Sequence, residues 1–228
     1  MKIFITGHRG FIGSNLFYQL KDIYNYELLT CDEKNNISKL KNILKKSDLV
    51  LHFAGINKSN NKEDFMKINH GLTKEICDIC KSLNKKIPIV FASSIHVKNS
   101  NEYGLSKLAA EKEIQDYSKK TGANIYIFRL PHVIGKWCKA NYNSVVATFC
   151  HNIANDIPIE IHDPDKIINL VYIDDLVSKI CEIIKGVAGN NKFIDVDKKY
   201  PISIKNLANV LNSFKESRNS LNIENFGD

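Results

Sequence analysis

A tyrosine and a lysine four residues apart form the most chemically suggestive pair in this chain of 228 residues. Tyr103 and Lys107 open a run with helical periodicity, and their i, i+4 spacing places both side chains on one face of a helix. A phenol with a pKa of about 10 is a poor proton donor or acceptor near neutrality, and a nearby ammonium lowers that pKa by favouring the phenolate. The pair therefore predicts proton transfer by Tyr103 beside a charged Lys107. A solvated helix start is the competing interpretation.

A serine at the end of the preceding strand-like run completes this set. Ser94 follows the run at 88–93, and a hydroxyl there is suited to hydrogen-bond an oxygen that gains charge during a reaction; Ser93 is the neighbouring candidate. We predict that Ser94, Tyr103 and Lys107 catalyse hydride transfer between a nicotinamide and a carbon that bears oxygen, with Tyr103 as the acid or base. His96 joins Ser94 among the side chains expected to contact the substrate.

A glycine-rich turn lies between the first strand-like run and the first amphipathic helix. Glycines spaced by three allow a tight turn, a close backbone approach to a pyrophosphate, and close packing of the helix on the strand. The start of the helix also presents unpaired N–H groups and a positive dipole to the phosphates. The cofactor contacts predicted at this turn are Gly7, Arg9, Gly10, Phe11, Ile12 and Gly13.

The ends of later strands supply the rest of the predicted dinucleotide site. Ala54 and Gly55 are small enough to let the backbone lie against the cofactor, Lys107 would hold the nicotinamide ribose, and Pro131 would lie beside the carboxamide. Asp32 follows the second strand, where a carboxylate binds ribose hydroxyls and repels a 2′-phosphate, which favours NADH. Arg9 would instead meet a 2′-phosphate, so NADPH and NADH both stay open, as does Asp32 as an ordinary turn residue.

The elements that must position these residues alternate between strand and helix. Strand-like runs cover 2–6, 26–31, 48–55, 88–93 and 124–130, and helical patterns cover 11–22, 37–46, 62–83 and 103–120. The strands are short and apolar without strict alternation, which is typical of strands covered on both faces. We therefore predict an α/β fold, a Rossmann-like parallel sheet with helices on both faces. Asn69 falls in the third helix, either tying strands near the active site or solvated.

After Pro131 the pattern changes. A polar stretch leads to a helix at 144–155, strands at 158–162 and 167–173, a helix at 174–186, a strand at 192–196 and a helix at 203–216. This part is too small for an independent domain. We expect one domain over 1–228, in which 1–131 form the dinucleotide-binding core and 132–228 form mostly a small substrate-capping lobe, with part of the core.

Composition excludes several classes of function. No apolar run approaches the roughly 20 residues that span a bilayer, so we expect a cytoplasmic protein without a membrane partner. The net charge of +7 comes from scattered lysines, which predicts no nucleic-acid site but suits doubly anionic ligands. Cys77 and Cys80 fall inside a helical pattern without a second pair, so we predict buried thiols and no metal site.

The glycine turn, the Ser-Tyr-Lys set and the segment 129–135 together resemble the extended short-chain dehydrogenases, which act on nucleotide-sugars. The segment 135–150, GKWCKANYNSVVATFC, resembles more narrowly the N-terminal reductase domain of the CapF-type capsular-polysaccharide enzymes. The segments 169–175 and 214–218 fit the same family, so the likeness runs nearly end to end.

This resemblance implies reduction, with NADPH, of the C4 ketone of a UDP-2-acetamido-2,6-dideoxyhexos-4-ulose on the route to UDP-N-acetyl-L-fucosamine. It also implies that Lys136, Trp137, Asn141 and Asn143 line the sugar-nucleotide side, although an ordinary polar loop stays open. Analogy to other extended members suggests a homodimer through the helix that carries Tyr103.

Two departures from that family stand out. The His-rich strand pattern of its C-terminal cupin domain, which epimerises C3, does not follow, so we expect no C3 epimerisation by this chain alone. Asp32 and Glu33 stand where the family carries basic character, which again leaves NADPH and NADH open.

Three rival functions deserve comparison. A 4,6-dehydratase needs an acid and a base beside the serine, where this chain has Ile95 and His96. A 4-epimerase uses the same Ser-Tyr-Lys set and stays open. A non-catalytic dinucleotide-binding module usually loses the tyrosine or the lysine, and both are present here.

Overall fold

A six-stranded parallel sheet forms the centre of the molecule. The computed structural model describes residues 1–24, 26–31, 37–186 and 192–220. The strand order is β2-β1-β3-β4-β5-β8, and every neighbouring pair is parallel. The strands are β1 (Lys2–Thr6), β2 (Glu27–Thr30), β3 (Leu49–His52), β4 (Ile89–Ser94), β5 (Ile125–Leu130) and β8 (Phe193–Ile194). The predicted Rossmann-like sheet is confirmed, with strand ends within a few residues of those expected.

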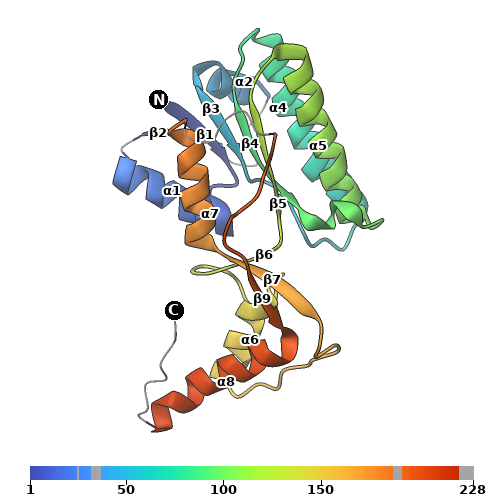
Figure 1. The fold of residues 1–228 in the computed structure, drawn as a ribbon. Coiled ribbons are helices and arrows are strands. Elements are labelled where there is room, and N and C mark those ends of the chain that lie inside the picture. The colour runs from blue at the N-terminus through green and yellow to red at the C-terminus, as the bar shows by residue number, and fades with distance from the viewer. Residues whose placement is uncertain (25, 32–36, 187–191, 221–228) are drawn as a thin grey trace.

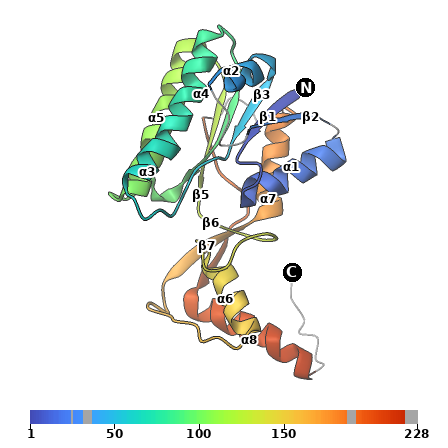
Figure 2. The same ribbon diagram turned by 180° about the vertical axis from the view of Figure 1, so that it is seen from behind.

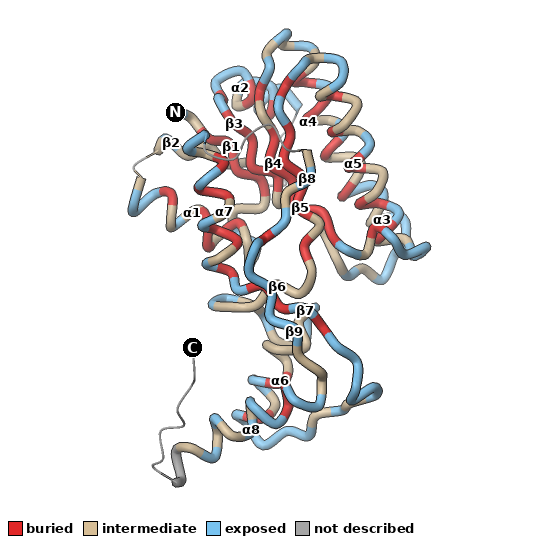
Figure 3. Tube along the Cα trace, viewed as in Figure 1, coloured by how far each residue is buried: buried red, intermediate tan, exposed pale blue. Residues whose placement is uncertain are grey.

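Helices cover both faces of this sheet, as predicted (Figure 1). On one face lie α1 (Phe11–Tyr24) and α7 (Ile173–Ile184), whose apolar side chains pack on alternate strand residues such as Ile3 and Ile5. On the other face lie α2 (Ile37–Lys46), α4 (Gly71–Ser82) and α5 (Glu102–Thr121), which pack on the intervening residues such as Phe4. The four central strands β1, β3, β4 and β5 are therefore mostly buried, whereas β2 and β8 at the edges are not (Figure 3). Burial of the central strands explains their continuous apolar character.

A smaller lobe lies beyond the carboxyl end of the sheet (Figures 1 and 2). It contains a three-stranded sheet in the order β6-β7-β9, in which β6 and β7 are parallel and β9 is antiparallel to β7. These strands are β6 (His132–Ile134), β7 (Ile167–Tyr172) and β9 (Tyr200–Ser203), and the helices are α6 (Val145–Ala154) and α8 (Ile204–Ser220). The lobe has a separate apolar cluster that includes Phe149, Leu170 and Leu207.

The structure differs from the sequence prediction in three places. The strand predicted at 158–162 is wrong: this segment has no ladder partner, Pro158 lacks the N–H that a ladder needs, and Ile159 and Ile161 instead pack into the lobe cluster. The short strands β6 and β9 were not predicted. The single helix predicted at 62–83 is divided into α3 (Glu63–Phe65), a π-helix (Met66–His70) and α4.

The two cysteines of the CxxC sequence are buried helix residues, as expected. Cys77 and Cys80 lie in α4 against the sheet, and burial raises the pKa of both thiols, that of Cys80 to about 12. Within the described residues, no group of three or more metal-ligating side chains is found, and no helix is long and apolar enough to cross a bilayer.

Candidate active site

One cleft of about 740 Å³ collects most of the residues predicted to do chemistry. It lies where β1, β3, β4 and β5 end and the lobe begins, and open α/β sheets bind their ligands at this edge. Its volume is in the range of small-molecule sites. The lining comes from the glycine turn, the segments 53–57, 92–96 and 130–134, the start of α5, and the segment 137–146.

The glycine turn has the shape of a phosphate cradle. Gly7 has a φ of +70°, and a Cβ on it would lie 2.6 Å from the backbone nitrogen of Ala54. A Cβ on Gly13 would lie 2.1 Å from the carbonyl oxygen of Gly7, so both positions require glycine. The first turn of α1 contains no acidic residue, and its N–H groups lie at the cleft. This cradle fits the pyrophosphate of a dinucleotide.

Ser94, Tyr103 and Lys107 meet in the same cleft. The Ser94 side chain interacts with the Tyr103 phenol and lowers its pKa. The buried Nζ of Lys107 donates to the carbonyl oxygen of Ala92 at 2.9 Å and lies 4.9 Å from the centroid of the Phe91 ring. The three side chains, one from β4 and two from α5, therefore lie together around the end of β4.

The pKa values of this trio differ from the expectation in one respect. Burial raises the pKa of Tyr103, and the hydrogen bond with Ser94 opposes that rise. The expected lowering of the Tyr103 pKa by the lysine is wrong for this structure, because burial dominates and the ammonium is bonded to Ala92 instead. Burial also lowers the pKa of Lys107 to about 8, against the opposing charge of Glu111.

Asn69 ties the cleft together and is not solvated. Its Oδ1 accepts from the backbone N–H of Ile56 at 2.8 Å, and its Nδ2 donates to the Ile56 carbonyl at 2.9 Å and to the Ser106 hydroxyl at 3.0 Å. The Ser106 hydroxyl donates in turn to the carbonyl oxygen of Tyr103 at 2.8 Å. A Cβ on Gly55 would lie 2.7 Å from Asn69 Oδ1, which explains the glycine there. The π-helix aims Asn69 at this loop.

Sequence reasoning missed a buried histidine behind the cleft. His52 ends β3, with Nδ1 2.7 Å from the Thr6 hydroxyl and Nε2 2.8 Å from the Thr73 hydroxyl. The Thr73 hydroxyl donates to the Asn69 carbonyl, so it accepts from a protonated Nε2; Thr6 then donates to Nδ1 and accepts from Ala54 N–H. Burial lowers the His52 pKa to about 3, and this neutral tautomer links β1, β3 and α4. The only signal in the sequence was His52 itself, a polar residue at the end of an otherwise apolar strand.

The structure brings most of the other predicted site residues to the cleft. Those that line it are Arg9, Gly10, Phe11, Ile12, Gly55, His96, Pro131, Trp137 and Asn143. Ala54 lies directly behind Gly7 but does not line the cleft, and Asp32 falls outside the described residues. Tyr18, Asn57, His132 and Tyr142 also line the cleft and were not predicted.

Two residues predicted on the sugar-nucleotide side do not line the cleft. The Lys136 ammonium lies 3.6 Å from the Asp174 carboxylate, and the backbone N–H of Asn141 donates to the Thr148 hydroxyl at 2.9 Å. Trp137, which follows Lys136, does line the cleft, so this segment contributes to the cleft without these two residues.

The loop 135–144 runs between β6 and α6 of the lobe and contacts α1 of the core. Asn15 of α1 donates to the Lys136 carbonyl at 3.1 Å, and the rings of Tyr18 and Trp137 are 5.5 Å apart. Trp137 has a φ of +68°, an uncommon conformation for a residue with a side chain, and half of its surface is exposed at the cleft. The loop therefore spans from the helix behind the glycine turn to the start of α6.

A phosphate cradle on a parallel sheet, sharing one cleft with a serine, a tyrosine and a buried lysine, is the arrangement of a dinucleotide-dependent oxidoreductase. The chain belongs to the NAD dependent epimerase/dehydratase family, whose sequence model matches residues 3–194. Over 227 residues it is 40% identical to a UDP-2-acetamido-2,6-beta-L-arabino-hexul-4-ose reductase of Pseudomonas aeruginosa, covering 100% of this chain and 61% of that protein.

Solved structures agree with this family. The capsular polysaccharide assembling protein CapF of Staphylococcus aureus superposes with a TM-score of 0.85 at 34% identity, over 96% of this chain and 60% of that one. A UDP-glucuronic acid 4-epimerase of Bacillus cereus, in complex with NAD, shares the fold with a TM-score of 0.84 at 20% identity, over 94% of this chain and 83% of that one. The chain thus spans about three fifths of the length of its CapF and hexulose-reductase relatives.

Proposed function

We propose that this chain reduces the C4 ketone of a UDP-2-acetamido-2,6-dideoxy-4-hexulose, with a nicotinamide dinucleotide as the hydride donor, in the biosynthesis of UDP-N-acetyl-L-fucosamine for a capsular polysaccharide. The observation that carries the proposal is that Ser94, Tyr103 and Lys107 line one cleft with the glycine turn. The 40% identity to a reductase of a UDP-2-acetamido-hexulose supports the substrate class.

The residues of the chain suit the reductive direction. Reduction of a ketone needs a proton donor at the carbonyl oxygen, and the raised pKa of Tyr103 keeps its phenol protonated at neutral pH. The Ser94 hydroxyl hydrogen-bonds the same oxygen as negative charge develops on it. Lys107, which is mostly charged below its pKa of about 8, supplies positive charge beside the tyrosine and holds the nicotinamide ribose. The bound cofactor supplies the hydride.

A second helix start in the cleft supports a nucleotide-sugar substrate. Ser144 caps α6 by accepting from the N–H of Ala147 at 3.2 Å, and residues 144–146 line the cleft together with Lys139. The first turn of α6 has no acidic residue. Two helix starts, those of α1 and α6, therefore offer N–H groups to one cleft, one for the diphosphate of the cofactor and one for that of the UDP-sugar.

NADPH is the proposed cofactor, and NADH is its competitor. Arg9 is exposed in the glycine turn and lines the cleft, where a guanidinium suits a 2′-phosphate. The Asp32 carboxylate argues for NADH from the sequence. A cytoplasmic location and a homodimer through α5 remain predictions from the sequence and the family resemblance.

The test follows nicotinamide absorbance with each cofactor and a panel of UDP-4-keto sugars. We expect stoichiometric loss of reduced cofactor with the 2-acetamido-2,6-dideoxy substrate, and no turnover for Tyr103→Phe with unchanged cofactor affinity. Product formation without net cofactor consumption would identify a 4-epimerase instead. An undiminished rate in Tyr103→Phe would refute the catalytic assignment.

A further inference from the structure

The last three residues of β4, 92–94, are each held by a different residue of α5. Tyr103 interacts with the side chain of the last, Ser94. Lys107 donates to the carbonyl oxygen of the first at 2.9 Å, and Glu111 accepts from the hydroxyl of the middle one at 2.5 Å. The helix residues follow each other at i, i+4 and i+8, which places them on one face. Glu111 is therefore the third member of a row whose first two members face the cleft.

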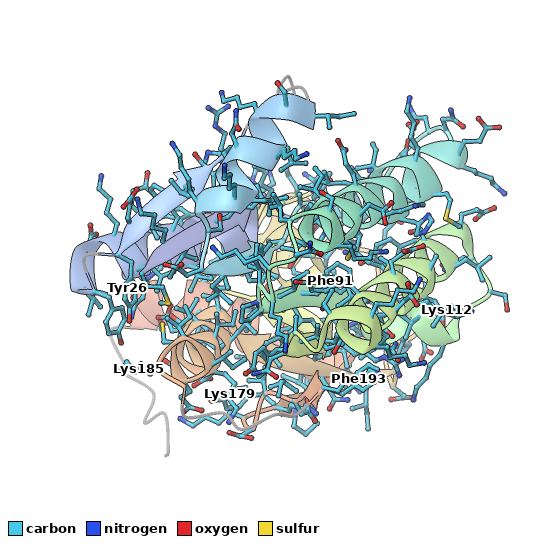
Figure 4. The ribbon with its side chains drawn as sticks, turned by 90° about the horizontal axis from the view of Figure 1, so that it is seen from above. Tyr26, Phe91, Lys112, Lys179, Lys185 and Phe193 are labelled. Atoms are coloured by element: carbon cyan, nitrogen blue, oxygen red, sulfur yellow. The ribbon has the colours of Figure 1, made fainter. Side chains whose placement is uncertain are left out.

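Glu111 is a fully buried carboxylate with two fixed partners. Besides the Ser93 hydroxyl, its Oε1 accepts from Nε of Arg129 at 3.0 Å and its Oε2 accepts from Nη2 at 2.6 Å. Arg129 lies in β5 directly opposite Ser93 in the strand register, and its guanidinium lies 4.6 Å from the ring centroid of Phe193 in β8. In Figure 4, Phe193 lies nearer the edge of the molecule than Phe91. Two charge-assisted hydrogen bonds from Arg129 thereby hold the carboxylate in place.

The charge of Glu111 acts on the buried ammonium one helix turn away. Burial lowers the pKa of Lys107 to about 8, and the Glu111 charge opposes this change. From β3, His52 also faces Lys107 electrostatically, but with a pKa of about 3 it is neutral at physiological pH. Tyr103, on the same helix face, is protonated there as well. Glu111 is thus the negative group that favours a charged Lys107.

We propose that Glu111 is a positioning residue of the active site: with Ser93 and Arg129 it sets the placement of α5 against β4 and holds a fixed negative charge behind Lys107. It touches neither the cleft nor a ligand, and it acts through the lysine. This inference rests on the proposed function, because it assumes that Lys107 binds the cofactor and supports Tyr103.

The test uses Glu111→Gln, which keeps an oxygen for Ser93 and removes the charge. The matched control is Glu113→Gln on the same helix, whose carboxylate pairs with His70 at 3.2 Å. The measurements are the dissociation constant of NADPH and the rate of ketone reduction, each from pH 6 to pH 9. We expect the basic limb of both profiles to move down by about one pH unit in Glu111→Gln, so that NADPH binds about fivefold more weakly at pH 8 and equally at pH 6.

A second variant guards against a folding defect. Ser93→Ala/Glu111→Met/Arg129→Met removes the whole network without leaving a buried unpaired charge, and we expect the same displaced limb. Wild-type pH profiles in both folded variants would overturn the inference. If Tyr103→Phe abolishes reduction in that case, the proposed function stands and only the role of Glu111 is refuted. If Tyr103→Phe keeps its rate, the proposed function fails, and the pH dependence of NADPH binding still decides whether Glu111 governs Lys107.

Discussion

Replacing the buried lysine with an apolar side chain should stabilise the protein while removing its activity. Lys107 is buried, and lowering its pKa from 10.5 to about 8 corresponds to about 3 kcal/mol of unfavourable free energy for the charged form in the folded state. Lys107→Met also loses the hydrogen bond to Ala92, which offsets about 1 kcal/mol. We therefore expect a gain of about 2 kcal/mol in the free energy of unfolding at pH 7.

The lowered pKa of Lys107 also determines how the stability of the wild type changes with pH. Between pH 8 and 10.5 the unfolded chain binds the lysine proton and the folded chain does not, so the wild type gains stability as the pH rises through this window. The gain in the free energy of unfolding of Lys107→Met over the wild type should then be largest below pH 8 and shrink toward pH 10.5. Urea unfolding at a series of pH values measures it.

A matched control separates burial from the loss of a charge. Lys112 lies on the same helix with an exposed side chain (Figure 4), so Lys112→Met should change stability by no more than about 0.5 kcal/mol. A Lys107→Met protein that is less stable than the wild type at every pH would show that the lysine is not desolvated in the way described, and would refute the reasoning.

Three further predictions concern the surrounding site. Gly13→Ala should abolish dinucleotide binding, measured by calorimetry, because its Cβ would lie 2.1 Å from the Gly7 carbonyl; retained affinity would contradict the cradle. His52→Gln should reduce the loss of stability on acidification, since the unfolded imidazole binds a proton below pH 6.5 and the folded one only near pH 3. Urea unfolding between pH 6.5 and 4 tests this, and an unchanged slope of the free energy of unfolding against pH would count against it. Trp137 is the single tryptophan, so its fluorescence should change on NADPH binding, and a silent spectrum would exclude contact between the loop 135–144 and the cofactor.

The glycine turn and the grouping of Ser94, Tyr103 and Lys107 in one cleft could be predicted because their requirements are local. A glycine with φ of +70° and a helix pair at i, i+4 leave their mark in spacing alone. The order of strands and helices followed from apolar periodicity for the same reason. The end of β4 beside Tyr103 then followed from parallel topology.

The supporting network could not be predicted, since its partners come from distant segments. Glu111 reads as one more surface charge in the run AAEKEI, and only the packed structure brings Arg129 from β5 against it. The same holds for the direction of the Tyr103 pKa, which depends on burial, and for β6 and β9, which are too short for a periodic pattern. The sequence suggested a strand at 158–162, which the structure does not form, and Pro158 lacks the N–H that a ladder needs.

The path of the chain between sheet and lobe constrains how this protein can be cut or rearranged. The polypeptide leaves the core after β5, returns as α7, contributes β8 to the edge of the large sheet and leaves again for β9 (Figure 2). A fragment that stops at residue 131 would lack α7 and expose the apolar sheet face that Leu176 and Ile180 cover. Such a fragment should aggregate unless the remainder is supplied as a separate peptide. Exchange of lobes between relatives must therefore preserve α7, because this helix belongs in sequence to the second half of the chain and packs on the large sheet.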